Sequence, residues 1–250
     1  MAPGDRTVIT WLGHATVLLE LDGARFLTDP VLRDRIGPLV RIAPDGGIDP
    51  PGRVDCVLLS HLHADHTDLP SLEVVARSVP VLAPYPAGAW LTRHGLHDVR
   101  ELRPGSEVAV AAVRVSATPA AHNPRRWPLG PRADPVGYLI SGTQSVYFAG
   151  DTDLFDAMAD LRGSVAVALL PVWGWGRRLG PGHLDPERAA RAAALIAPAI
   201  AIPIHWGTFA PRWTVGRMPA EPAHEFARLA ARYAPSVEVR VLAPGERIEL

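Results

Sequence analysis

The chain has 250 residues, 48% of them hydrophobic, which is enough for a sizeable buried core in one large domain or two small ones. Its 25 basic and 26 acidic residues give a formal net charge of -1, so no overall positive field would attract nucleic acid or an anionic membrane surface. No lysine occurs, which excludes Schiff-base and P-loop lysine chemistry.

The cysteine content and the apolar stretches indicate in which cellular compartment the protein is expected. The single Cys56 lies in an apolar run, cannot form an internal disulfide, and is expected to be a packed thiol. The N-terminal region has no basic stretch followed by a long apolar run, so no export signal is indicated. The stretch from Ala192 to Ile204 is shorter than the roughly 20 residues that span a bilayer. We therefore expect a soluble, cytoplasmic protein without a membrane span.

The first part of the chain is expected to form a β-meander and then to alternate strands with helices. The predicted strands are Thr7–Leu12, Thr16–Leu21, Arg25–Thr28, Val54–Ser60 and Val79–Ala83, and the predicted helices are about Leu69–Arg77 and Ala87–His94. The segment from Val31 to Gly52 is rich in proline, glycine and arginine, which predicts a long loop with weak helical character at best.

The second part repeats this order. Its predicted strands are Val99–Leu102, Glu107–Val110, Val113–Ala117, Tyr138–Ser141, Ser145–Ala149, Val165–Pro171, Ile200–Ile204, Val237–Val241 and Arg247–Leu250. Its predicted helices are Asp153–Leu161, Glu187 to about Ile196, and Pro222–Ala234. Strands followed by a βαβα unit, twice over and without a linker, predict one domain over residues 1–250, with two mixed sheets face to face and helices outside.

Four potential metal ligands fall within six residues directly after a predicted strand. On an extended stretch residues two apart point the same way, so His61 and His63 can share one cation. If the chain then turns into the predicted helix, the side chains of Asp65 and His66 point towards a second cation. Desolvating this cluster without a cation would be costly, so the pattern predicts half of a two-metal site.

Further candidate ligands each follow an apolar strand pattern, namely His122, Asp151 and His205. We expect one ion on His61, His63 and His122, and the other on Asp65, His66 and His205. The carboxylate of Asp151 would bridge both. Nitrogen and oxygen ligands without sulfur favour two zinc ions, with manganese or iron as alternatives.

These motifs resemble the metallo-β-lactamase superfamily, whose H-x-H-x-D-H motif residues 61–66 match in full. The spacing of His122, Asp151 and His205 is similar to the family's three later ligand motifs, so the resemblance covers nearly the whole chain. It implies an α/β fold, a four-layer αββα sandwich with the metals at one edge.

Within the superfamily, three stretches look like the branch that contains the ascorbate-phosphate lactonase and the N-acyl-phosphatidylethanolamine phospholipase D: Trp11–Thr16, Thr28–Pro30 and Ile204–Phe209. Asp151 stands where the best-known true β-lactamases carry cysteine, which argues against antibiotic hydrolysis as the main activity.

The resemblance and the chemistry of such sites imply that a water between the two ions loses a proton near neutral pH and attacks a phosphorus or carbonyl centre. Asp65 would ligate one ion and help to orient the hydroxide. His183 precedes a helix, as a site histidine does in the resembling phospholipase branch, and would protonate a leaving group or hold an oxyanion. A solvated loop histidine is the alternative.

Other polar and aromatic residues have weaker expected roles. His14 and Asp29 are expected to hydrogen-bond metal ligands, with turn capping as the alternative for Asp29. Loop arginines are candidates for gripping phosphate, although solvation is their usual role: Arg125, Arg126, Arg132, Arg177 and Arg178. Four tryptophans would line an apolar cleft or simply cap the core: Trp127, Trp173, Trp175 and Trp213.

The sequence thus predicts a dinuclear metal-dependent hydrolase that cleaves a phosphodiester, a phosphorylated lactone or a related small ester. Its partner would be a small anionic substrate, with no nucleic acid and no preferred oligomeric state indicated. Two alternatives stay open. One is a metal-dependent nuclease, which the near-neutral charge weakens. The other is a non-catalytic module that senses a metal or ligand.

Overall fold

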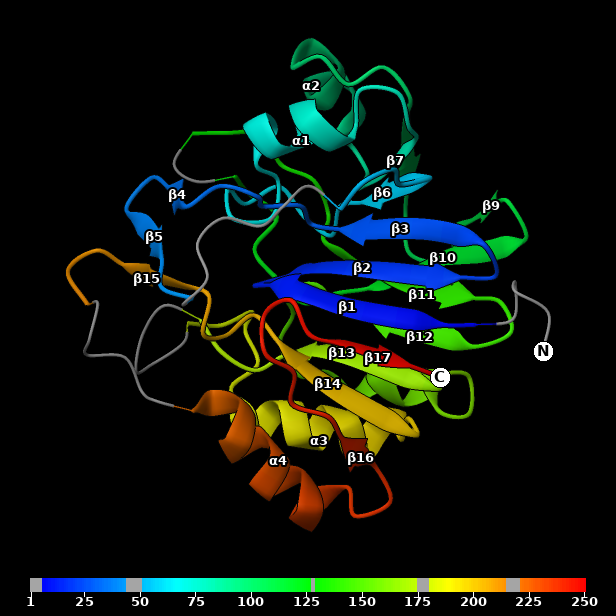
Figure 1. The fold of residues 1–250 in the computed structure, drawn as a ribbon, viewed down its shortest axis with the longest axis vertical. Helices are drawn as coiled ribbons and strands as arrows, with labels where there is room; N and C mark the ends of the chain where they lie inside the picture. Colours follow the sequence, from blue (N-terminus) through cyan, green and yellow to red (C-terminus); the bar gives the residue numbers. More distant parts are fainter. Residues whose placement is uncertain (1–5, 44–50, 127–128, 175–179, 215–220) are drawn as a thin grey trace.

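The computed structural model describes residues 6–43, 51–126, 129–174, 180–214 and 221–250. Two seven-stranded sheets face each other, and helices cover their outer faces (Figure 1). The first sheet has the order β17 (Arg247–Glu249), β1 (Val8–Gly13), β2 (Thr16–Leu21), β3 (Ala24–Thr28), β6 (Cys56–Leu58), β7 (Val81–Pro84) and β8 (Val99–Leu102). The second has the order β16 (Glu238–Val239), β14 (Ile200–Ile204), β13 (Val167–Pro171), β12 (Ser145–Phe148), β11 (Val136–Ser141), β10 (Val113–Pro119) and β9 (Glu107–Val110).

Both sheets combine an antiparallel part with a parallel part. In the first sheet β17, β1, β2 and β3 pair antiparallel, whereas β3, β6, β7 and β8 pair parallel. The second sheet repeats this arrangement, because β9 to β12 are antiparallel and β12, β13, β14 and β16 are parallel. The predicted sandwich of two mixed sheets is confirmed.

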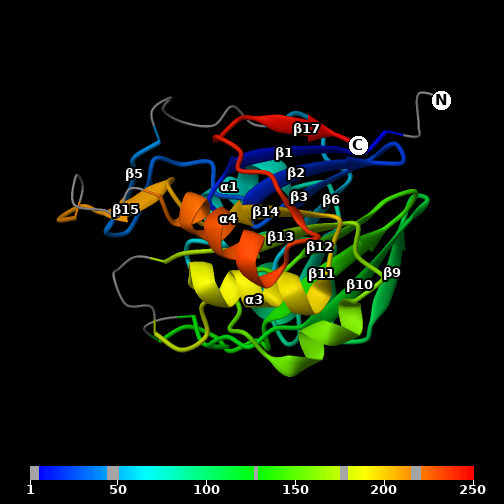
Figure 2. The same cartoon turned by 90° about the horizontal axis from the view of Figure 1, so that it is seen from below.

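The helices form the outer layers. On the first sheet lie α1 (Leu69–Val75) and α2 (Gly88–Arg93), and on the second lie α3 (Pro186–Ile196) and α4 (Pro222–Tyr233). Figure 2 shows α3 and α4 side by side against the second sheet. The inner face of α3 is mostly alanine, which lets its backbone approach the sheet closely. Among the described residues, no helix combines the length and apolar composition that a membrane span requires.

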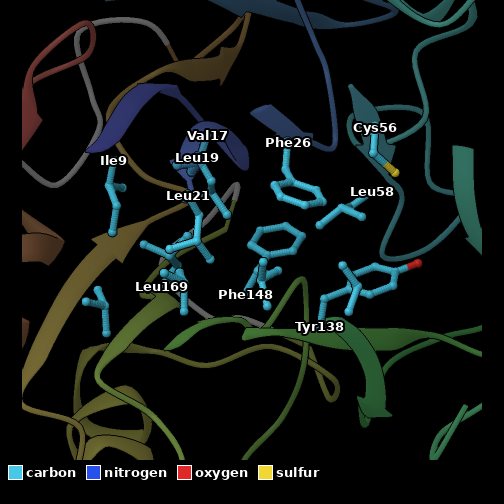
Figure 3. Close-up of a cluster of buried hydrophobic side chains, with 14 of the residues drawn as sticks. Ile9, Val17, Leu19, Leu21, Phe26, Cys56, Leu58, Tyr138, Phe148 and Leu169 are labelled. Carbon is cyan, nitrogen blue, oxygen red and sulfur yellow. The ribbon is translucent and has the colours of Figure 1, made fainter. Parts of the chain in front are cut away.

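The main core fills the space between the two sheets. Phe26 and Leu58 point inward from the first sheet, and Phe148 and Leu169 point inward from the second (Figure 3). All four side chains are fully buried. Each such side chain contributes roughly 1.5–3 kcal/mol by leaving water, so the face-to-face packing of the sheets is the main source of stability.

Two predictions of local structure were wrong. The segment predicted as a long loop contains a hairpin of β4 (Arg35–Ile36) and β5 (Leu39–Arg41), which joins β15 (Phe209–Pro211) in a third sheet. Arg41 holds this hairpin by donating to the Val31 carbonyl at 3.0 Å, a contact that no local pattern reveals. The helix predicted over Asp153–Leu161 is shorter, a 3₁₀ helix, η1, at Asp156–Leu161.

Candidate metal centre

The candidate site lies where strands of both sheets end. Since β10 and β12 are each antiparallel to β11, they run in the same direction, and β13 and β14 are parallel to β12. In the first sheet β1, β3 and β6 share a direction for the same reason. A polar residue follows the carboxyl end of nearly every one of these strands: His14, Asp29, His61, His122, Asp151 and His205.

Three histidines form the first group. Ligand atoms of His61, His63 and His122 lie within 4.8 Å of one another. Nε2 of His122 is 3.0 Å from Nδ1 of His63, although the two residues come from different sheets. This is the group that the sequence assigns to one ion.

The second group contains His14 in addition to the three residues that the sequence assigns to the second ion. Its members, again with ligand atoms within 4.8 Å, are His14, Asp65, His66 and His205. Nε2 of His66 lies 3.1 Å from Nε2 of His205, and Oδ2 of Asp65 lies 3.7 Å from Nε2 of His66. His14 directs Nε2 towards Oδ2 of Asp65 at 3.3 Å.

Asp151 lies between the two groups. Its Oδ1 is 3.3 Å from Nε2 of His205, and its Oδ2 is 3.4 Å from Nε2 of His66. The same Oδ2 is 4.0 Å from Nε2 of His122 in the first group. All seven residues named as ligands from the sequence are thus brought together.

Hydrogen bonds to the outer ring nitrogens tell which nitrogen of each imidazole faces the centre. Nδ1 of His122 donates to the Gly182 carbonyl at 2.6 Å, and Nδ1 of His205 donates to the Trp173 carbonyl at 2.6 Å. Nε2 of His63 donates to the Arg125 carbonyl at 3.0 Å. A nitrogen that donates on one side leaves a lone pair on the other, so these rings present metal-binding nitrogens to a common space.

His61 and His66 are oriented through one carboxylate. Asp29 accepts from Nδ1 of His66 at 2.7 Å and from both the backbone N–H and the hydroxyl of Ser60. Since the Ser60 hydroxyl donates to Asp29, it accepts from Nδ1 of His61 at 2.9 Å. The expectation that Asp29 contacts a ligand is met.

The donor atoms fit metal ions better than they fit one another. Nε2 of His61 is buried and has no hydrogen-bond partner, a costly state for a polar atom unless a cation is bound. In two pairs of histidines, ring nitrogens face each other: His63 and His122 at 3.0 Å, and His66 and His205 at 3.1 Å. The lone pairs of two such nitrogens repel unless a proton or cation lies between them. A tetrahedral zinc ion with nitrogen ligands at about 2.0–2.1 Å would separate them by roughly 3.3 Å.

The electrostatics favour positive charge at this point. Burial lowers the pKa of His61 well below 6.5, and burial lowers that of His205 to about 3 and that of His63 to about 4, so these rings are neutral as ligands must be. Burial also acts to lower the pKa of His66, but the carboxylates of Asp151 and Asp65 raise it well above 6.5. A proton on His66 therefore occupies a place where the carboxylates attract a cation.

His183 lies at the solvent side of the centre. Its Nε2 is 3.7 Å from Oδ2 of Asp151, and its side chain is 30% exposed. Its ring packs edge-on against His122. His183 is therefore within reach of both the candidate ligands and bulk water.

The loop residues have mixed roles. Arg126 does not face solvent as a phosphate-binding arginine would, because its Nη1 donates to the carbonyl of Leu62 within the ligand motif and to that of Thr67 directly after it. Arg125 and Arg132 are exposed. Trp173 belongs to the core under α3, whereas Trp213 is exposed. The remaining candidates lie outside the described residues: Trp127, Trp175, Arg177 and Arg178.

Sequence reasoning missed Ser60 and Asp153, and it assigned Arg126 to phosphate binding rather than to the backbone of the ligand motif. Asp153 accepts from the backbone N–H of Gly182 at 3.0 Å, next to His183. Arg126 and Asp153 each contact a backbone group distant in sequence, so no local motif marks these roles. Ser60 alone had a signal, since it directly precedes His61 at the strand end.

Comparisons with known proteins agree with this geometry. Residues 24–206 match the model of a family described as the β-lactamase superfamily domain. A metal-dependent hydrolase of Methanopyrus kandleri is 36% identical over 249 residues, covering 96% of this chain and 99% of that protein. Another, of Opitutus terrae, is 33% identical over 253 residues, covering 97% and 99%.

A solved structure extends the likeness to three dimensions. A metallo hydrolase from Ignicoccus hospitalis superimposes with a TM-score of 0.76 at 25% identity, covering 98% of both chains. The chain therefore belongs to the metallo-β-lactamase superfamily and, within it, to a family of metal-dependent hydrolases.

Proposed function

We propose that this hydrolase uses two divalent metal ions to cleave a phosphodiester, a phosphorylated lactone or a related small ester. The observation that carries the proposal is the place of Asp151 between two groups of histidines. Its carboxylate is 3.3 Å from His205 in one group and 4.0 Å from His122 in the other. A carboxylate so placed is suited to contact two cations at once.

The proposed ligand set follows the two groups. One ion would be held by His61, His63 and His122, and the other by Asp65, His66 and His205, with Asp151 touching both. Nitrogen and oxygen donors without sulfur favour zinc, with manganese or iron as alternatives. When bound, the ions supply Lewis acidity and lower the pKa of water towards neutrality.

The chain's own residues would handle protons and orientation. His183 would donate a proton from Nε2 to the leaving oxygen, since this atom lies 3.7 Å from Asp151 and its side chain also reaches solvent. Asp65 would orient the attacking water, held in place by His14 at 3.3 Å. Asp29 and Ser60 would keep His61 and His66 in the tautomer that presents Nε2.

An anionic substrate is supported by the hairpin beside the first group. Arg125 and Arg132 pair across an isolated antiparallel bridge, so their side chains project from one face. The carbonyl of Arg125 accepts from His63, which places this hairpin at the rim of the centre. Two guanidinium groups there would hold a phosphate of the substrate by bidentate hydrogen bonds.

The first test measures metal and turnover on one preparation. Elemental analysis of protein purified without chelator should give about two first-row transition ions per chain. The metal-loaded protein should cleave bis(p-nitrophenyl) phosphate, act more weakly on unphosphorylated lactones, and act little on cephalosporins, compared by kcat/KM. His205→Ala and Asp151→Ala should each abolish turnover, whereas Asp160→Ala, which removes an exposed carboxylate, should not.

Three outcomes would count against the proposal. Protein that refuses zinc and manganese with its fold intact would exclude a metal centre. Robust cephalosporin cleavage without action on diesters would overturn the order of substrates. Metal uptake without turnover of any substrate would favour the non-catalytic alternative.

A further inference from the structure

We propose that Asp153 is a positioning residue that holds the ligand His122 and the acid His183 in place through the backbone of Gly182. Asp153 lies two residues beyond Asp151 and belongs to neither ligand group. The part that concerns His183 rests on the function proposed above. The part that concerns His122 needs only a bound metal.

Gly182 is fixed through both of its backbone polar groups. Its N–H donates to Oδ2 of Asp153 at 3.0 Å, and its carbonyl accepts from Nδ1 of His122 at 2.6 Å. Its φ of +89° favours glycine, and a Cβ there would lie 3.0 Å from Nδ1 of His122. A side chain at residue 182 would therefore crowd the His122 ring in addition to straining the backbone.

This contact determines which nitrogen of His122 faces the centre. A carbonyl can only accept, so the proton of His122 is on Nδ1 and the lone pair is on Nε2. Nε2 is the atom that lies 3.0 Å from His63 and 4.0 Å from Asp151. By holding the Gly182 carbonyl in place, Asp153 favours the metal-binding tautomer of His122.

Asp153 also helps to hold the backbone of His183, through Arg188. Nη1 of Arg188 lies 3.1 Å from Oδ1 of Asp153 and 3.4 Å from the His183 carbonyl. The His183 ring itself is held weakly, since Nδ1 is 3.4 Å from the Gly180 carbonyl. Its distance to Asp151 therefore depends on the backbone, which Asp153 and Arg188 hold from two sides.

Asp153 makes contacts besides its surface ion pair with Arg188. Its own N–H donates to the carbonyl of Ala121 at 2.8 Å, the residue before His122, and its side chain is 20% exposed. An exposed pair alone would contribute little. Asp153 instead joins the end of β10 to the loop before α3.

The first arm of the test measures zinc affinity by chelator competition and needs no substrate. Asp153→Ala should raise the dissociation constant of the ion that His122 helps to hold by about 10- to 100-fold, as for the loss of a group that orients a metal ligand. Asp153→Asn should recover most of the affinity, because its amide oxygen can still accept from Gly182. The matched control is Glu187→Ala, which removes an exposed carboxylate paired with Arg191 on α3.

The second arm measures kcat in a double-mutant cycle with His183→Ala. If Asp153 acts through His183, Asp153→Ala should lower kcat at least about tenfold in the wild-type background and much less when His183 is already absent. If Asp153→Ala does not fold, Arg188→Ala provides the kcat arm, because it removes the other contact to the His183 backbone. Asp153→Leu then provides the affinity arm, because leucine is similar in size but has no acceptor for the Gly182 N–H.

The outcomes separate the two proposals. Zinc affinity in Asp153→Ala within twofold of wild type would overturn the role for His122. An equal fall of kcat in both backgrounds would overturn the role for His183. If no ester is cleaved by any form, the proposed function fails while the affinity arm still decides the role of Asp153.

Discussion

Individual residues of the centre have an unusual backbone. His14, Asp29 and His205 have positive φ values of 53°, 32° and 63°, and they are three of the six described non-glycine residues that do. This conformation costs of order 1–3 kcal/mol at each residue and persists only where the surroundings enforce it. The His14 carbonyl provides such a restraint, because it accepts from the His205 N–H at 2.8 Å and from the Trp11 indole at 2.9 Å.

The side chain of His14 leads to a prediction at this scale. Replacing His14 by alanine removes the imidazole that lies 3.3 Å from Asp65, so the carboxylate would lose its orientation. Zinc affinity, measured by chelator competition, should fall by about tenfold or more. His94→Ala is the matched control, since His94 is exposed and contacts only the Trp90 ring among the described aromatic side chains. Equal affinity in the two variants would show that His14 is not needed to orient Asp65.

Cys56 gives a second prediction for a single residue. It is fully buried, and burial raises its pKa to about 12. Because the thiolate is the reactive form, the native thiol should be inert. We expect no reaction with a disulfide reagent at pH 8 in native buffer and one thiol per chain in denaturant. Rapid labelling of native protein would contradict the predicted packed thiol.

Among the elements, α3 has a start that the sequence marks clearly. The side chain of Asp185 accepts from the Arg188 N–H at 2.8 Å, and Pro186 follows as the first helical residue. Asp185→Ala should therefore lower the free energy of unfolding in urea by about 1 kcal/mol. Glu187→Ala, in the same first turn, caps nothing and should change it by less. A larger effect of the second variant would show that the cap is not what stabilises this helix start.

The elements also show where sequence reasoning succeeds. The strand, the ligand motif and the start of α1 were predictable because their signals lie within a few residues of one another, from Cys56 to Leu69. The pairing of β5 with β15 was not, since it joins segments far apart in the chain. Contacts such as Arg126 with Leu62 also depend on the folded chain. Local patterns thus predicted the candidate ligands and the supporting His14 and Asp29, whereas the contacts of Arg126 and Asp153 needed the structure.

For the whole molecule, the order of elements was enough to predict the sandwich. Each half of the chain supplies an antiparallel part and a parallel part, and buried strands of this kind need cover on both faces. The ligands follow the same division, because His61 and His63 come after a strand of the first sheet and His122 and His205 after strands of the second. Metal ions at this edge would therefore link the two sheets.

That link predicts a dependence of stability on metal. The unfolded chain does not hold the ligands together, so bound metal should stabilise the folded state by about 2.7 kcal/mol when its free concentration is 100 times the dissociation constant. For a chain of this size, that corresponds to a rise in Tm of roughly 5–10 °C. Calorimetry of chelator-treated protein, before and after zinc is added back, would measure it.

Asp151→Ala tests whether the rise comes from this centre. The variant removes the carboxylate that lies 3.3 Å from His205 and 4.0 Å from His122, so it should lose most of the zinc-dependent rise. Its zinc-free Tm should also be lower, because without metal Asp151 contacts His66 at 3.4 Å, so the comparison uses the zinc-dependent rise within each protein. An equal zinc-dependent rise in both proteins would place the stabilising metal elsewhere on the chain.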